Sequence, residues 1–257
     1  MITDGEIAAF IQQYFLPLIR ISSMFMVMPI LGSKLVNTKA RLSIAVLTTI
    51  LVVPLLPPLP SMTALTYQGM ILVAREALIG VLTGFSFQIV FQVFVLTGQI
   101  LSMKMGLGFA QMNDPSSGLQ TTALSQFYLM LTTLIFVSTD GHLLMLMLLV
   151  ESFQTLPPGQ MTFDVAIFMK VVSLASWMFA TALRLSLPVI TSLLLINIAF
   201  GVMSRAAPQL NIFAVGFPFT LMCGLVLMWI GLGNFNYAYL DVTEHGFMFL
   251  RNILELK

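Results

Sequence analysis

Apolar residues fall into six long runs along the chain, and short polar or proline-rich segments separate them. The runs cover residues 7–31, 42–59, 70–103, 122–149, 165–203 and 212–232. A transmembrane helix needs about 20 consecutive, mainly apolar residues. The pattern therefore predicts an all-α fold, that of a polytopic membrane protein of about six apolar helical runs.

Two of these runs are too long for a single membrane crossing. As one helix, residues 70–103 would measure about 50 Å at about 1.5 Å per residue, whereas the hydrocarbon core is about 30 Å thick. Residues 165–203 also exceed one crossing, and Pro188 inside them favours a kink. We expect each run to be broken, or to leave the bilayer while packed against protein. In the first of them, Gly80 and Gly84 have the spacing that lets two helices approach closely.

An irregular segment, residues 104–118, interrupts the apolar pattern near the middle of the chain. Its glycines permit positive φ, Pro115 cannot continue a helix, and Asp114 before it is pushed away from the α region. Irregular backbone at membrane depth must lie against protein or line a cavity, and methionine fills irregular space well. A deformable plug and an ordinary interhelical connection both stay open, and composition alone favours the connection. The candidate plug residues are Met105, Gly106, Leu107, Gly108, Phe109, Met112, Asp114 and Pro115.

The composition supports a membrane location. Of the 257 residues, 58% are hydrophobic and 8% are charged, whereas about 25% are charged in a soluble domain. The net charge of +1 excludes a general electrostatic attraction to nucleic acid. The single cysteine, Cys223, lies in an apolar run, where we expect a small buried side chain. The acidic N-terminus and the long first run argue against a cleavable signal peptide. Cytoplasmic loops are enriched in lysine and arginine, so one side of the membrane is marked as cytoplasmic by Lys34, Lys39, Arg41, Lys104 and Arg205.

Charged residues inside the apolar runs each cost about 2.5–3.5 kcal/mol on insertion scales, so each needs a partner. Arg75 and Glu76 are adjacent, and adjacent helical residues do not face each other, so we expect them to find different partners. Acids within the runs are few, which favours interhelical or intersubunit ion pairing over an ion-conducting path. Intersubunit polar contacts are expected at Arg20, Arg75, Glu76, Lys170, Arg184 and Arg205.

Residues that could support catalysis or metal binding are few. His142 and His245 lie far apart, and neither an HExxH nor a GxSxG pattern occurs. Asp140 and His142 could in principle bind a metal, but Asp140-Gly141 is a turn signal that favours splitting residues 122–149 into two half-helices or a hairpin. We expect no enzymatic activity, no cofactor and no metal.

Several short motifs in a fixed order resemble the FliR family, the flagellar member of the FliR/SctT group of type III secretion export proteins. The resemblance spans nearly the whole length of the chain. It rests on the order and spacing of the motifs more than on any single motif, since each motif is short. The motifs are Phe109-Ala110 with Asp114-Pro115, then Asp140-Gly141-His142 and Thr155-Leu156-Pro157, then residues 187–191, 197, 201–213 and 216–218.

The resemblance implies a subunit of the flagellar protein-export gate. Proteins of this family join FliP-like and FliQ-like subunits in a helical hetero-oligomer, which FlhB-like and FlhA-like proteins engage. Unfolded axial proteins pass through its centre. The implied location is the bacterial inner (cell) membrane, multi-pass, in the flagellar basal body, with the assembly partly raised toward the periplasm. Such a position would account for the over-long runs.

The resemblance also implies one export-gate domain over residues 1–257. Residues 1–160 resemble FliP and include the plug loop 104–118, whereas residues 161–257 resemble a FliQ-like hairpin with a C-terminal tail. In this family apolar, methionine-rich elements close the central pore, which makes residues 105–118 a pore plug.

Two alternatives differ from this interpretation. One is the injectisome counterpart, which the sequence separates only weakly from the flagellar protein. The other is a secondary transporter or channel, which predicts a monomer or symmetric oligomer with inverted repeats and acids at the membrane midplane. A gate subunit predicts copurification with other small apolar proteins.

Overall fold

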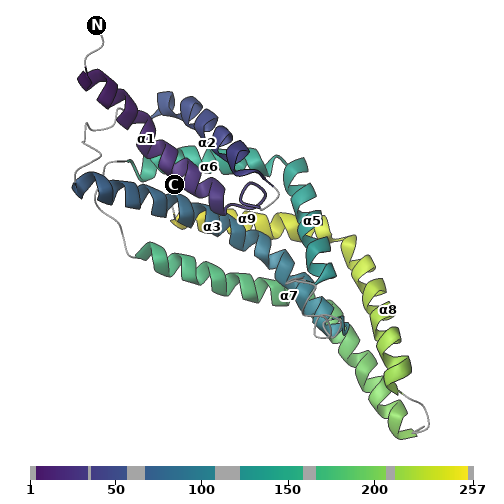
Figure 1. Cartoon of the computed structure of the whole chain (residues 1–257). Coiled ribbons are helices and arrows are strands. Elements are labelled where there is room, and N and C mark those ends of the chain that lie inside the picture. The colour runs from purple at the N-terminus through teal and green to yellow at the C-terminus, as the bar shows by residue number, and fades with distance from the viewer. Residues whose placement is uncertain are drawn as a thin grey trace. The chain divides into compact units, whose positions relative to one another are not determined.

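The computed structural model describes residues 4–33, 36–56, 67–107, 122–158, 166–206 and 212–253. All regular secondary structure in these ranges is helical (Figure 1). This confirms the predicted all-α class. The elements are α1 (Asp4–Val27), α2 (Thr38–Val52), the 3-10 turn η1 (Val53–Leu55), α3 (Tyr67–Lys104), α5 (Ala123–Ser138), α6 (Gly141–Thr155), α7 (Ala166–Ala206), α8 (Ile212–Leu232) and α9 (Phe235–Ile253).

Three stretches within the described ranges are long and apolar enough to cross a membrane, namely Thr38–Leu55, Tyr67–Lys104 and Ile167–Ala206. Two bent helix pairs could each form one more span, α5 with α6 at 72° and Gly216–Leu232 with Phe235–Asn252 at 68°. The polytopic architecture is therefore confirmed, with three to five candidate spans. The first apolar run forms α1, which carries Arg20 and is not among these candidates.

Helices α3 and α7 are continuous over 38 and 41 residues. At about 1.5 Å per residue they measure about 57 and 60 Å. Of the two alternatives expected for these runs, a break is therefore wrong and an over-long continuous helix is found, and α7 continues through Pro188. Between α5 and α6 the predicted split does occur, at Asp140, which has a positive φ of 56°. Aspartate is one of the few residues that tolerate this conformation.

The described chain forms two compact units. Unit 1 comprises Met1–Ile89, Thr139–Ala175 and His245–Lys257, and unit 2 comprises Val90–Ser138 and Ser176–Glu244. The boundaries fall inside α3, α7 and α9 as well as between α5 and α6. The predicted division into a FliP-like part, residues 1–160, and a FliQ-like part, residues 161–257, is about resemblance to other subunits, not about compact units. It stays a prediction.

Glycines allow close backbone approach within each unit. In unit 1, α2 packs against α1 (Figure 1), and α3 meets α1 at Gly80 and Gly84, as the spacing predicts. A Cβ atom at Gly84 would lie 2.6 Å from the carbonyl oxygen of Met24. In unit 2, a Cβ at Gly98 would lie 2.8 Å from the carbonyl oxygen of Leu124 on α5. A larger side chain at any of these glycines would push two helices apart.

Unit 2 has an aromatic core. The ring of Phe235 on α9 lies 5.4 Å from that of Phe94 on α3 and 5.6 Å from that of Tyr128 on α5, centroid to centroid. Phe91 and Phe136 form a further edge-to-face pair at 5.2 Å. Such contacts add to the stabilisation that burial of apolar surface already gives.

Unit 1 encloses a charged cluster of three side chains. Arg20 and Glu76 are 0% exposed and Arg75 is 4% exposed. Glu76 Oε2 accepts from Arg20 Nε at 2.7 Å and lies 2.6 Å from Arg20 Nη2, and Glu76 Oε1 accepts from Arg75 Nη1 at 3.0 Å. The expectation that Arg75 and Glu76 find different partners is therefore wrong. A carboxylate has two oxygens, and the long side chain of Arg75 reaches one while Arg20 takes the other.

The C-terminal end of α6 supplies further acceptors. Arg20 donates to the carbonyl oxygens of Ser152 at 2.9 Å and Leu156 at 2.7 Å. Arg75 donates to the carbonyl oxygen of Pro157 at 3.2 Å. Carbonyls at a helix C-terminus carry partial negative charge, so they offset the positive charge that one carboxylate leaves over from two arginines. The cluster thus joins α1, α3 and the end of α6.

Replacing Glu76 with glutamine should destabilise the folded chain by about 3–5 kcal/mol, because two buried cations lose their only carboxylate. The same exchange at Glu244, an exposed residue, should change stability by less than about 0.5 kcal/mol. The measurement is the midpoint of detergent-induced unfolding of each variant, extracted gently together with the membrane proteins that copurify with it. Equal midpoints for Glu76→Gln and Glu244→Gln would show that the cluster does not stabilise unit 1.

Candidate functional site

The described part of the predicted plug segment lies in unit 2, where α3 ends. Leu107 N–H donates to the carbonyl oxygen of Ser102 at 3.0 Å, and Gly106 N–H donates to that of Met103 at 3.1 Å. Gly106 has a φ of 83°. These two bonds and the left-handed glycine form a Schellman motif, which satisfies carbonyls that a helix end leaves open. The direction in which the chain leaves α3 at Lys104 is therefore fixed.

Helix α8 covers this end of α3. Met105 is 0% exposed, and its side chain lies against Gly224. A Cβ atom at Gly224 would be 2.6 Å from Met105 Cγ and 2.9 Å from its Sδ and Cε. The ring of Phe217 covers Gly106, where a Cβ atom would meet the aromatic carbons. A side chain at Gly224 would have to displace Met105, and one at Gly106 would have to displace the ring of Phe217 and adopt a positive φ that favours glycine.

An open cavity of about 360 Å³ lies beside the same helix end. Its walls come from the end of α3, from α7 and from α8. Phe200 and Phe217 give it apolar surface, while Asn197, Lys104 and Thr220 add polar groups. The cavity leaves room for side-chain movement at the end of α3.

Only some of the predicted plug residues fall within the described ranges. Met105, Gly106 and Leu107 are brought together at the end of α3, against α8. The plug function itself stays a prediction, because the other candidates, Gly108, Phe109, Met112, Asp114 and Pro115, lie outside the described residues.

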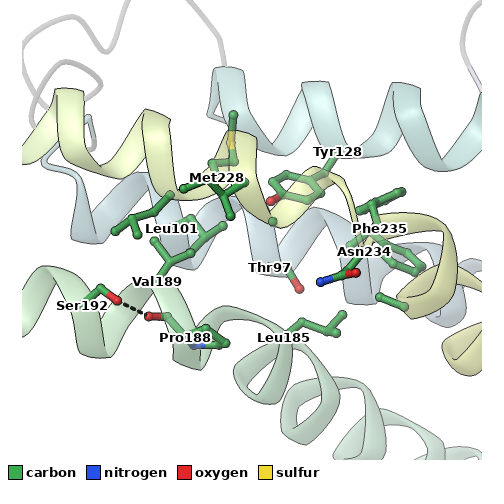
Figure 2. A pocket seen from close by; sticks show the side chains of 15 residues that line it. Thr97, Leu101, Tyr128, Leu185, Pro188, Val189, Ser192, Met228, Asn234 and Phe235 are labelled. Atoms are coloured by element: carbon green, nitrogen blue, oxygen red, sulfur yellow. Dashed lines mark hydrogen bonds between the residues drawn. The ribbon is translucent and has the colours of Figure 1, made fainter.

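A second cavity in unit 2, of about 350 Å³, lies beside Pro188 of α7 (Figure 2). Its lining is mainly apolar, with hydroxyl and amide groups from Thr97, Tyr128, Ser192 and Asn234. Ser192 Oγ donates to the carbonyl oxygen of Pro188 at 2.8 Å. Such a lining suits an apolar group held by a few hydrogen bonds. The sequence marked Pro188 as a helix irregularity but gave no sign of the side chains around it.

Four of the five cations predicted to contact other subunits have partners within the described chain. Arg184 Nη2 donates to Asp241 Oδ2 at 2.7 Å within unit 2, with side chains 63% and 32% exposed. Lys170 Nζ donates to the carbonyl oxygen of Asn252 at 2.9 Å within unit 1. Arg205 is exposed in the last turn of α7, where a cation is favourable. Arg20, Arg75 and Glu76 form the buried cluster of unit 1, and none of these contacts tests a role between subunits.

Asp241 is the partner that sequence reasoning missed. It lies in α9, after the last apolar run, and no spacing in the sequence relates it to Arg184, 57 residues earlier. An exposed pair in water contributes at most about 1 kcal/mol, but in an apolar environment each charge needs the other. The pair therefore suits a surface that another protein or lipid covers.

The described residues contain no group of three or more histidine, cysteine, aspartate or glutamate side chains that could hold a metal ion. Cys223 is half-buried on α8, so the expectation of a buried thiol is wrong. The reason is that α8 is apolar all round, and sequence pattern alone does not show which side faces the protein.

Comparison with known proteins gives a consistent result. The family model described as "Bacterial export proteins, family 1" matches residues 11–246. The flagellar biosynthetic protein FliR of Escherichia coli strain K12 is 35% identical over 227 residues, which cover 88% of this chain and 87% of the relative. The protein of the same name from Pectobacterium carotovorum is also 35% identical, over 87% of this chain and 85% of the relative.

A more distant relative extends the similarity. The flagellar biosynthetic protein FliR of Bacillus subtilis strain 168 is 27% identical over 246 residues, or 95% of each chain. The matches include both compact units and both helices that exceed one membrane crossing. The chain therefore belongs to the FliR family of bacterial export proteins.

Proposed function

We propose that this chain, with FliP-like and FliQ-like subunits, forms the pore through which unfolded axial proteins leave the cell. As a FliR-family protein with apolar helices, the chain is a membrane-associated component of the flagellar export apparatus. The observation that carries the proposal is the family match over residues 11–246. The relatives described above are flagellar proteins, which favours the flagellar gate over its injectisome counterpart.

Helix α7 supports an assembled state. In its most apolar 18-residue window only 11% of residues are buried within the chain, against 67% for α3. Exposed side chains include Leu194, Leu195 and Val202. At about 60 Å, α7 is twice as long as the hydrocarbon core is thick, so lipid alone does not cover it. Neighbouring subunits are the natural cover for the rest.

The plug proposal concerns the loop that follows α3. Its described beginning is apolar and held against α8 within unit 2, which suits a segment that works inside protein. A hydrophobic constriction blocks ions by excluding water and needs no fixed charge. In this proposal, residues 105–118 close the pore when no substrate is present. FlhB-like and FlhA-like proteins engage the gate in the bacterial inner membrane, and its raised position toward the periplasm explains the length of α3 and α7.

The assembly is tested by coexpression. Produced alone, the chain should aggregate or be cut readily by protease, because the apolar surface of α7 lacks cover. Coexpression with FliP-like and FliQ-like subunits should give a stable complex on gentle detergent extraction, measured by size and subunit composition. A stable, monodisperse monomer would contradict the proposal and favour a transporter.

The plug is tested by replacing residues 108–118 with a Gly/Ser linker of equal length, which keeps Gly106 and Leu107 in place. The complex should assemble, yet the membrane should conduct ions in the absence of substrate, because the linker is flexible and polar. Substituting only Phe109 and Met112 with alanine should give a milder leak. Ion conductance and secreted flagellin are measured together. An assembled linker variant that stays ion-tight and exports normally would leave the segment as a connection only.

The Arg184–Asp241 pair is proposed to lie at a subunit contact. Arg184→Leu should then lower recovery of the complex, because the contact with the neighbouring subunit is lost and Asp241 is left unpaired. The double variant Arg184→Leu, Asp241→Leu separates two explanations. If the pair only neutralises charge within the chain, removing both charges restores assembly. If it contacts a neighbour, as proposed, complex recovery stays low.

A further inference from the structure

We infer that α8 is the seat of the loop that follows α3, with Gly224 and Phe217 as positioning residues that fix where this loop begins. The inference rests on the proposed function of the loop as a plug. It goes beyond that function because it places the control of the loop in α8, which lies far along the chain from the loop itself.

The backbone gives the first part of the argument. The two Schellman hydrogen bonds use the carbonyl groups of Ser102 and Met103, and Gly106 takes the left-handed conformation that the motif requires. The chain therefore leaves α3 in one defined direction. Gly106 therefore ends the helix in a fixed conformation and does not act as a free hinge.

The side chains give the second part. Met105, the residue between the helix and Gly106, is completely buried. Its Cγ, Sδ and Cε atoms all approach the backbone of Gly224 so closely that a methyl group at this position would overlap them. Phe217, two turns earlier on α8, covers Gly106. Two positions on one helix thus hold two consecutive residues at the root of the loop.

A matched control position for Gly224 is available on α8, at Gly231. A Cβ atom at Gly231 of the same helix would have no other atom within 4 Å. Glycine to alanine raises helix propensity equally at both positions. A difference between Gly224→Ala and Gly231→Ala therefore reports on the contact with Met105. The open cavity of about 360 Å³ beside Met105 offers room for a displaced thioether, so the Gly224→Ala variant should still fold and assemble.

The seat is tested directly by cross-linking in the assembled complex. In a Cys223→Ala background, Met105→Cys with Gly224→Cys should form a disulfide on mild oxidation, since the contact brings the two Cβ atoms near the separation of about 3.5–4.5 Å that a disulfide needs. Met105→Cys with Gly231→Cys should not. The cross-linked gate should remain ion-tight and export at the normal rate, because the root stays seated while the loop opens. Failure of the first pair to cross-link, or loss of export that reduction restores, would overturn the inference.

The effect on the plug is tested by ion conductance. Gly224→Ala should raise the leak of the resting complex several-fold over Gly231→Ala. The double variant Met105→Ala, Gly224→Ala should leak no more than Met105→Ala alone, since Gly224 acts through Met105 and the two changes are then not additive. Equal leaks from the two alanine variants, or additive effects, would overturn the inference.

The two proposals can fail separately. An ion-tight Gly/Ser-linker variant would disprove the plug whatever α8 does. A leaking linker variant combined with an ion-tight Gly224→Ala variant would keep the plug and reject α8 as its seat. The cross-link reports on the seat in both cases.

Discussion

Glu76 accepts hydrogen bonds from two arginines at a point where all three side chains are removed from solvent. Each bond alone is ordinary, but a buried charge without a partner is costly enough to unfold a marginally stable domain. The three residues come from α1 and α3, and the surplus positive charge is met by carbonyls at the end of α6. The arrangement of unit 1 therefore depends on a charge balance that only this set of helices provides.

The same requirement, that polar groups away from water be satisfied, shapes the other end of α3. There the carbonyl groups that the helix end leaves unpaired accept hydrogen bonds from the backbone N–H groups of Gly106 and Leu107, and no side chain is needed. Helix α3 is thus fixed near its start by ion pairs in unit 1 and at its end by a backbone motif in unit 2. Each end of α3 is thus defined within its own unit, and the direction in which the chain leaves α3 is set by the backbone motif in unit 2.

Sequence reasoning succeeded where the cause is local. The apolar runs, the turn at Asp140 and the close approach at Gly84 follow from residue type and spacing. It failed where the cause lies in residues far apart along the chain, as for Asp241 beside Arg184 or Gly224 beside Met105. For the over-long runs, residues 70–103 and 165–203, apolar length left two alternatives open, a break or a helix that exceeds one membrane crossing, and both runs form continuous helices. The loop residues 108–118 remain a matter of family resemblance and experiment.

The buried cluster also constrains how the protein is made. Arg20 precedes Glu76 by 56 residues and Ser152 by 132. At a synthesis rate of about 5–20 residues per second, Arg20 waits roughly 3–11 s for its carboxylate and roughly 7–26 s for the end of α6. During that time Arg20 has neither its carboxylate nor its carbonyl partners. The final contacts of α1 within unit 1 therefore form only after α3 and the end of α6 have been made.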